Sequence, residues 1–99
     1  MNANVSIQVL PQYCKTKEEV IRFVDEVIDY IKSTGLKYYV GPSETAIEGE
    51  YEEIMEVVKE CQYIAVNAGC PGVLSYVKIG FEPEGGVLTI DEKVTKHHK

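Results

Sequence analysis

The sequence carries little positive charge. Over 99 residues the formal net charge is −6, Arg22 is the only arginine, and no lysine cluster is long enough to follow a phosphate backbone. We therefore expect neither a nucleic acid nor an anionic membrane surface as a partner. The acidic balance instead favours solubility and weakly attracts cationic ligands.

Long apolar runs are also missing. No stretch approaches the roughly 20 residues of a membrane span, and residues 1–11 lack the basic start and apolar centre of a signal peptide. The hydrophobic fraction of 44% is that of an ordinary globular protein. The chain is long enough for one domain and too short for two, so we expect a single cytoplasmic domain spanning residues 1–99.

Cysteines and histidines are few and scattered. Cys14, Cys61 and Cys70 form an odd set without a CxxC pair, which is typical of a reducing cytoplasm rather than of a disulfide framework. His97 and His98 have no ligand-spaced cysteine or carboxylate pair beside them, so we expect no metal and no cofactor. A cysteine nucleophile would need a positioned histidine base, and both histidines stand in the tail. We expect no catalysis.

The pattern that is present alternates strand and helix twice. Alternation and β-branched residues predict four strands, at residues 5–9, 38–40, 45–48 and 73–81. One helix is opened by the capping-box residue Thr16 and closed at Gly35, and a second runs between Gly49 and Gly69. A further capping box at 89–92 predicts a short terminal helix. The order βαββαβ predicts an α+β, ferredoxin-like sandwich, with a four-stranded antiparallel sheet and both long helices on one face.

Each long helix carries one apolar stripe that we expect to face the sheet. The stripe of the first helix comprises Val20, Ile21, Val24, Val27, Ile28 and Ile31. That of the second comprises Ile54, Val57, Val58, Cys61, Ile64, Ala65 and Ala68. The strand residues expected against these stripes are Val5, Ile7, Val9, Val77 and Ile79.

The other face of the sheet is left open, and it mixes polar with aromatic side chains. The alternation places there Ser6, Gln8, Ala46, Glu48, Leu74, Tyr76 and Lys78. The second strand adds either Tyr39 or the pair Tyr38 and Val40. A mixed face of this kind suits a sheet-to-sheet dimer that also holds a small polar ligand.

Two plainer interpretations of this face stay open. In the first, Glu48 and Lys78 form only an ion pair, within the chain or across an interface. In the second, Tyr76 and Leu74 only pack against a second chain and bind no ligand.

Four stretches together point to a family. They are Gly35–Ser43, Thr45–Gly49, Val77–Ile79 and Thr89–Val94. Their order and spacing resemble those of the small thiamine-binding, YkoF-like proteins, over roughly residues 5–96. The resemblance implies a ferredoxin-like fold, a sheet-to-sheet homodimer or homotetramer, and non-catalytic binding of thiamine or its hydroxymethylpyrimidine moiety. Many relatives carry a basic residue where Gly72 stands here, so an unphosphorylated ligand is expected.

Eight residues are candidates for binding this ligand. The matching stretches contain Ser43, Thr45, Glu48 and Lys78, and strand alternation adds Ser6, Gln8, Tyr39 and Tyr76. Thiamine carries a thiazolium cation and an aminopyrimidine. A glutamate can accept from the amino group or offset the cation, hydroxyl and amide groups can supply neutral hydrogen bonds, and a tyrosine ring can stack or hold the cation.

Two other functions compete with this one. The open face would serve only oligomerisation in a structural or regulatory module without a ligand. An enzyme of the acylphosphatase type on the same fold would need an arginine in a strand-to-helix loop, whereas Arg22 lies inside the first predicted helix. The fold alone does not choose among these functions.

Overall fold

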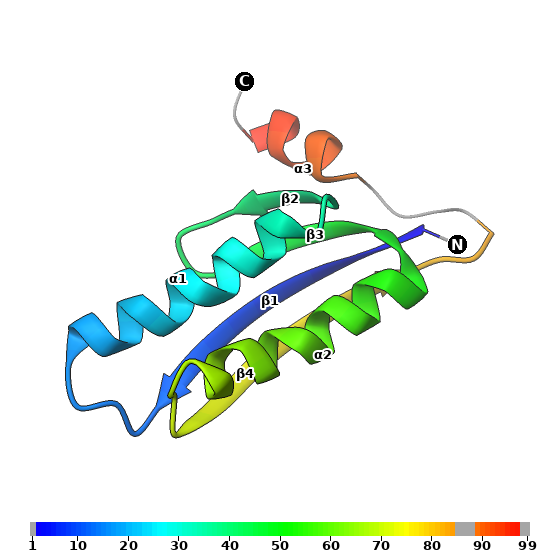
Figure 1. Ribbon diagram of the computed structural model, residues 1–99. Helices are drawn as coiled ribbons and strands as arrows, with labels where there is room; N and C mark the ends of the chain where they lie inside the picture. Colours follow the sequence, from blue (N-terminus) through cyan, green and yellow to red (C-terminus); the bar gives the residue numbers. More distant parts are fainter. Residues whose placement is uncertain (1, 85–88, 98–99) are drawn as a thin grey trace.

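Four antiparallel strands form one sheet in the order β2-β3-β1-β4, with two long helices across one face (Figure 1). The computed structural model describes residues 2–84 and 89–97, with side chains as far as Val94. The elements are β1 Asn2–Gln12, α1 Lys17–Ser33, β2 Lys37–Val40, β3 Thr45–Glu50, α2 Tyr51–Asn67, β4 Gly72–Phe81 and α3 Ile90–His97. The ferredoxin-like order expected from the sequence is confirmed. The turn expected at Glu84-Gly85-Gly86 and the histidine side chains lie outside the described residues.

The helix ends follow the local sequence signals. The Thr16 hydroxyl accepts the Glu19 N–H at 3.1 Å and caps the start of α1. At the other end the Thr34 hydroxyl donates to the Ile31 carbonyl at 2.7 Å, and Gly35 follows with φ 79°. Gly69 ends α2 in the same region of positive φ, at 111°. Glycine is favoured at both positions because a Cβ is disfavoured in that conformation.

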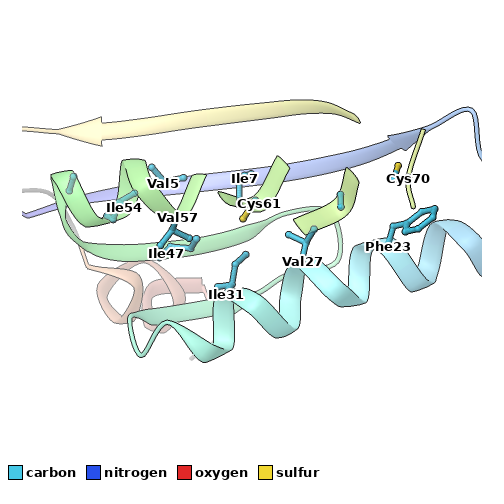
Figure 2. Close-up of a cluster of buried hydrophobic side chains, with 12 residues drawn as sticks. Val5, Ile7, Phe23, Val27, Ile31, Ile47, Ile54, Val57, Cys61 and Cys70 are labelled. Atoms are coloured by element: carbon cyan, nitrogen blue, oxygen red, sulfur yellow. The ribbon is translucent and has the colours of Figure 1, made fainter. Parts of the chain in front are cut away.

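The core lies between the sheet and the two long helices (Figure 2). Its largest fully buried side chains are Phe23, Ile31, Ile47, Ile54, Val5 and Cys61. The stripe of α2 is confirmed at Ile54, Val57, Cys61 and Ala65, whereas the stripe of α1 needs a correction. Phe23 is buried, and Ile21 is 58% exposed. Ile21 lies about 120° around the helix from Val27, at roughly 100° per residue, and this turns it away from the sheet.

The strand register decides which hairpin tyrosine faces which side. Tyr38 pairs with Ile47, which is buried beneath the helices, and Tyr39 pairs with Ala46. Directly opposite residues share a face, so Tyr39 joins the open face while Tyr38 and Val40 lie on the helix side. Ile79 pairs with Val5 and shares its face, yet it is 46% exposed because β4 is the edge strand. The expected burial of Ile79 is therefore only partial.

The short terminal helix α3 lies on the face opposite the two long helices. It contacts β2 and β3, and a small cavity between it and the sheet is lined by Asn4, Ser6, Ala46, Ile90 and Val94, among others. Ile90 is only 5% exposed and is its apolar anchor. α3 thus covers the open face near Asn4, Ser6 and Ala46 and leaves Tyr39, Leu74 and Tyr76 exposed. In the described part of the chain, no helix is both long and apolar enough to cross a membrane.

The two isoleucines of α1 provide a matched test of this packing. Ile31 is 1% exposed, and Ile31→Ala is expected to lower the free energy of unfolding by about 2–5 kcal/mol. Ile21→Ala, the same substitution on the exposed side of the same helix, is expected to change it by no more than about 0.5 kcal/mol. Urea denaturation followed by circular dichroism measures both. Equal losses would contradict the assignment of the buried stripe.

Candidate functional site

Two neighbouring rows across the open face gather five of the eight candidate residues. The register places Tyr39, Ala46, Ser6 and Lys78 in one row that crosses all four strands. The next row contains Gln8 and Tyr76, which are paired between β1 and β4. Tyr76 is 60% exposed and Tyr39 is 41% exposed, so both rings are accessible. The rows present a hydroxyl, an amide, a cation and two aromatic rings within one small area.

Glu44 completes this area and was missed in the sequence. The β1-β3 register, continued by one residue, sets Glu44 opposite Gln8. Its carboxylate lies 3.4 Å from Lys78 Nζ, with both side chains partly exposed. The missed signal was the alternation itself, because Glu44 precedes Ala46 and Glu48 on the same face at a spacing of two. An exposed pair of this kind is weak, so Glu44 remains available to a cation or an amino group.

A hollow of about 310 Å³ opens beside these rows at the hairpin turn. Its lining residues are Tyr39, Gly41, Pro42, Ser43, Glu44 and Ala46. The turn is closed by the Gly41 N–H, which donates to the Glu44 carbonyl at 2.9 Å. A Cβ at position 41 would stand 2.9 Å from that same oxygen, so the tight closure depends on glycine. Ser43 and Glu44 are thereby held at the rim of the hollow.

Thr45 lies on the other side of the hairpin. It is 6% exposed and shares the helix face with Ile7, its partner on β1. A second cavity, of about 160 Å³, lies there, with Thr45 and Ser43 at its rim and Val24, Val27 and Ile28 of α1 among its walls. This cavity exists because β3 pairs with β1 only as far as Ile7, while β1 continues to Gln12. Thr45 therefore supports the turn from behind and does not share a surface with Tyr39.

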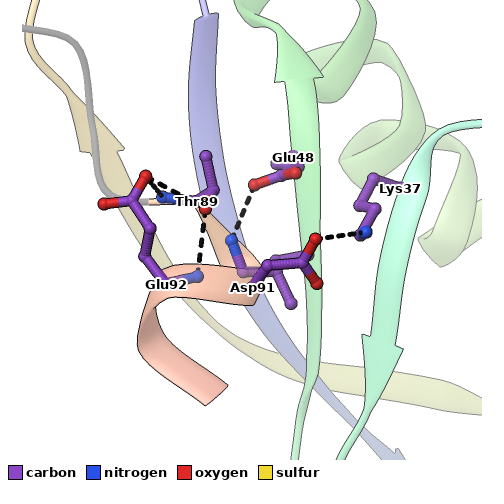
Figure 3. A network of polar contacts seen from close by, with 6 residues as sticks. Lys37, Glu48, Thr89, Asp91 and Glu92 are labelled. Atoms are coloured by element: carbon purple, nitrogen blue, oxygen red, sulfur yellow. Dashed lines mark hydrogen bonds and ion pairs between the residues drawn. The ribbon is translucent and has the colours of Figure 1, made fainter. Parts of the chain in front are cut away.

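Glu48 is engaged by α3 (Figure 3). Its Oε2 accepts the Ile90 N–H at 2.8 Å, which places a carboxylate at the N-terminus of that helix, where the helix dipole favours it. Thr89 and Glu92 form the predicted capping box, with the Thr89 hydroxyl accepting the Glu92 N–H at 3.1 Å. Within the chain Lys78 pairs with Glu44 rather than with Glu48. The structure thus places Glu48 at the border of the two rows, beneath α3.

Lys37 of β2 also holds α3 in place, through an ion pair with Asp91. Its Nζ lies 2.8 Å from Asp91 Oδ2, and this hydrogen bond, with the attraction of the charge, raises the pKa of Lys37. A raised lysine pKa favours the folded state at pH values below the ordinary lysine pKa. That contribution is lost as the pH rises through the raised value. Both groups are well exposed, so the contribution is small.

The described residues offer little for metal or nucleophilic chemistry. Among them, no group of three or more histidine, cysteine, aspartate or glutamate side chains is placed to hold a metal ion. Burial raises the pKa of the Cys61 thiol to about 12, which makes it a poor nucleophile at neutral pH. The open-face rows carry hydrogen-bonding groups, opposite charges and rings, a combination that suits the recognition of a small heteroaromatic cation.

Comparison with known proteins now decides the family. Residues 5–98 match the family model described as thiamine-binding protein. The chain belongs to the thiamine-binding protein family. It is 46% identical over 94 residues to a UPF0045 protein of Clostridium perfringens, covering 95% of each chain. The sequence resemblance to this family is thereby confirmed.

Solved structures of similar chains share the fold. A domain of unknown function, DUF77, from Bacillus cereus superposes with a TM-score of 0.88 at 37% identity, covering all of this chain and 92% of that one. A protein of Thermotoga maritima provisionally assigned to thiamine biosynthesis or salvage gives a TM-score of 0.84, also at 37% identity, with 98% and 99% covered.

The contacts of α3 give a direct test of the role of Glu48. Loss of a charge-assisted hydrogen bond in Glu48→Ala is expected to reduce the protection of the Ile90 amide against hydrogen exchange by about 10- to 100-fold. Lys37→Met, which removes an exposed ion pair, is expected to reduce it less than about fivefold. Amide exchange followed by NMR measures both, with Glu26→Ala on the exposed side of α1 as the control. Unchanged protection in Glu48→Ala would remove Glu48 from the support of α3.

Proposed function

We propose that this protein is a non-catalytic binding protein for thiamine or its hydroxymethylpyrimidine moiety. The observation that carries the proposal is the pair of open-face rows with Glu44 and the hairpin hollow beside them. Membership in the thiamine-binding protein family supports the ligand class. So does the likeness to the Thermotoga maritima protein provisionally assigned to thiamine biosynthesis or salvage.

The rows match the ligand group by group. The Glu44 carboxylate accepts from the exocyclic amino group of the pyrimidine or offsets the thiazolium charge, and it lies at the rim of the hollow. Gln8, Ser6 and Ser43 supply neutral hydrogen bonds to the ring nitrogens and the hydroxyl group. The rings of Tyr39 and Tyr76 offer faces for stacking and for cation–π attraction.

The remaining candidate residues act around the ligand. Lys78 holds Glu44 at 3.4 Å and is released to water when a cation takes its place. Thr45 supports the turn from the helix side, and Glu48 holds α3 at the border of the site. The ligand is thus contacted by the hairpin, β1 and β4, while α3 limits the site on the side of Glu48.

A second copy of the chain completes the proposed site. Tyr39 and Tyr76 are exposed at 41% and 60%, and Leu74 beside them is exposed at 48%. A hollow open on one side buries too little of a small ligand for tight binding, since ligand sites commonly bury most of the ligand surface. A sheet-to-sheet homodimer, which can associate further into a tetramer, covers these residues and closes the pocket at the interface.

Calorimetric titration of thiamine, hydroxymethylpyrimidine and thiamine diphosphate into ligand-free protein tests the proposal. We expect saturable binding of one or both unphosphorylated ligands and weaker binding of the diphosphate. Glu44→Gln is expected to weaken binding by about 10- to 100-fold, because a hydrogen bond to a charged group is lost. The matched control is Glu53→Gln, an exposed glutamate on α2, which should bind normally.

A second set of variants measures how much the Tyr39 ring contributes to ligand affinity. Tyr39→Phe keeps the stacking face and is expected to bind within about threefold of the unsubstituted protein, whereas Tyr39→Ala should lose at least about fivefold. Tyr63→Ala on α2, where Tyr63 is 54% exposed, is the matched control. No heat with any of the three ligands, from folded and ligand-free protein, would overturn the proposal in favour of an oligomerisation module without a ligand.

The oligomer is tested separately by light scattering at micromolar concentration. The unsubstituted protein is expected to give at least a dimer. Tyr76→Glu is expected to give a monomer because a charge would be desolvated at the centre of the interface. Tyr63→Glu, the same change on an exposed face of α2, should leave the oligomer intact. If the unsubstituted protein is a monomer, the pocket at the interface is refuted, whereas the proposed ligand is not.

A further inference from the structure

Two cysteines meet at the end of the sheet remote from α3. The last pair of the β1-β4 ladder is Gln12 with Gly72. Cys14 follows Gln12 by two residues after the end of β1, and Cys70 precedes Gly72 by two residues before the start of β4. The two cysteines therefore lie on either side of the last pair of the ladder, where both pack with the core. The spacing in the sequence, 56 positions apart, gave no hint of this proximity.

The sulfur contacts agree with the register. Cys70 Sγ donates to the Gly72 carbonyl at 3.0 Å, and Cys14 Sγ lies 3.8 Å from the Gln12 carbonyl, so each thiol points back toward the last pair of the ladder. The two thiols are also close enough to interact, and Cys70 contributes to raising the pKa of Cys14. Disulfides span Cα separations of about 4.4–6.8 Å, which suits two side chains that interact directly, as these thiols do.

The backbone turns both thiols to the same side. Tyr13, between Gln12 and Cys14, has φ 62°, and its ring is turned outward with the residue 83% exposed. Cys14 is half-buried as a result and packs against the core, where Cys70 is 3% exposed. Positive φ is uncommon for a tyrosine. Its consequence here is that the chain leaves β1 with Cys14 facing inward.

We propose that Cys14 and Cys70 form a redox modification site that closes into an intrachain disulfide by exchange with a low-molecular-weight disulfide. The Cys14 thiolate attacks one sulfur of the small disulfide, forming a mixed disulfide and expelling one small thiolate. Cys70 then loses its proton and attacks the Cys14 sulfur, which expels the second small thiolate. Two protein thiols are oxidised, one small disulfide is reduced to two thiols, and the two protons are taken up by those products.

The order of attack follows from exposure and charge. Cys14 is the more accessible of the two, since it is half-buried whereas Cys70 is buried. Its pKa is raised, first by burial and then by Cys70 and Glu19, with the Arg22 guanidinium acting in the opposite direction. The thiolate is therefore a small fraction at neutral pH, and the exchange is slow there. The rate is expected to rise about tenfold per pH unit below the raised pKa.

The disulfide would tie the loop before α1 to the loop after α2. Both elements are already joined at this end, because the Arg22 guanidinium donates to the Ala68 carbonyl at 3.1 Å. The closed ring would contain α1, β2, β3 and α2, a long segment whose unfolded ensemble the bond restricts strongly. The expected change is a rise in Tm on the order of 10 °C that a reducing agent reverses.

Oxidised glutathione is the probe for the test, applied to the full chain at pH 7, 8 and 9. Peptide mapping by mass spectrometry without reduction is expected to find Cys14 linked to Cys70, faster at each higher pH. Cys61 is expected to stay reduced because it is fully buried and its pKa is raised to about 12. Cys61→Ser is the matched control and should form the same link with the same rise in Tm.

The decisive variants are Cys14→Ser and Cys70→Ser, in which the link and the reversible rise in Tm should both disappear. Cys14 lies in a partly exposed loop, so Cys14→Ser is expected to fold and keeps the test valid even if Cys70→Ser does not. In Cys70→Ser the glutathione adduct on Cys14 should persist, since the resolving thiol is gone. A lasting adduct on Cys14 in the unsubstituted protein, or no modification at pH 9, would overturn the proposal.

Discussion

The unequal pairing of β1 is the constraint on which the other features depend. β1 is hydrogen-bonded to β4 over ten residue pairs, from Ala3–Phe81 to Gln12–Gly72, but to β3 over only six, ending at Ile7–Thr45. Because the β2-β3 hairpin is shorter than β1, the sheet has a step where β3 begins. At that step the turn of residues 41–44 stands free of β1, with a hollow on each side of it. The long β1-β4 ladder, by contrast, holds Cys14 and Cys70 together beyond its last pair.

The open face is divided by α3 into two halves of different character. At the end of the face near Glu48 and Lys37 it is covered by a short helix, which is held mainly by polar contacts, with Ile90 as the buried apolar residue. At the end near the hairpin turn the face keeps the exposed rings of Tyr39 and Tyr76 and the pair of Glu44 with Lys78. The proposed ligand and the proposed second copy are therefore both placed at the exposed end.

The sequence predicted the fold well because its signals are local. The capping threonine at 16, the glycines at 35 and 69 and the alternation in the strands each act within a few residues, and all were confirmed. The predicted buried stripe of α1 wrongly included Ile21 and omitted Phe23. Hydrophobicity alone does not tell which residue at the edge of a stripe contacts the partner helix. The face of Tyr39 followed only from the register.

The site was harder to predict because it depends on contacts between distant segments. Ser6, Gln8, Tyr76 and Lys78 were brought together by alternation, which the pleat of the sheet guarantees, and the register then added Tyr39. Glu48 was on the expected face, but no pattern in the sequence revealed that Ile90, 42 residues later, would use its carboxylate. Thr45, a candidate from the family resemblance, lies on the helix face, and its neighbour Glu44 lies on the open face.

β4 is an edge strand of the sheet, and an exposed edge strand can pair with another chain and aggregate. Within the described residues β4 has β1 on one side and no strand on the other, so a row of backbone groups along its outer side is open to strand addition by another chain. Between Gly72 and Phe81 the only charged residue is Lys78. Lysine in such a strand discourages uncontrolled edge-to-edge growth. Lys78, which pairs with Glu44 on the open face, is thus also a guard against aggregation, so its replacement by an uncharged residue is expected to lower solubility.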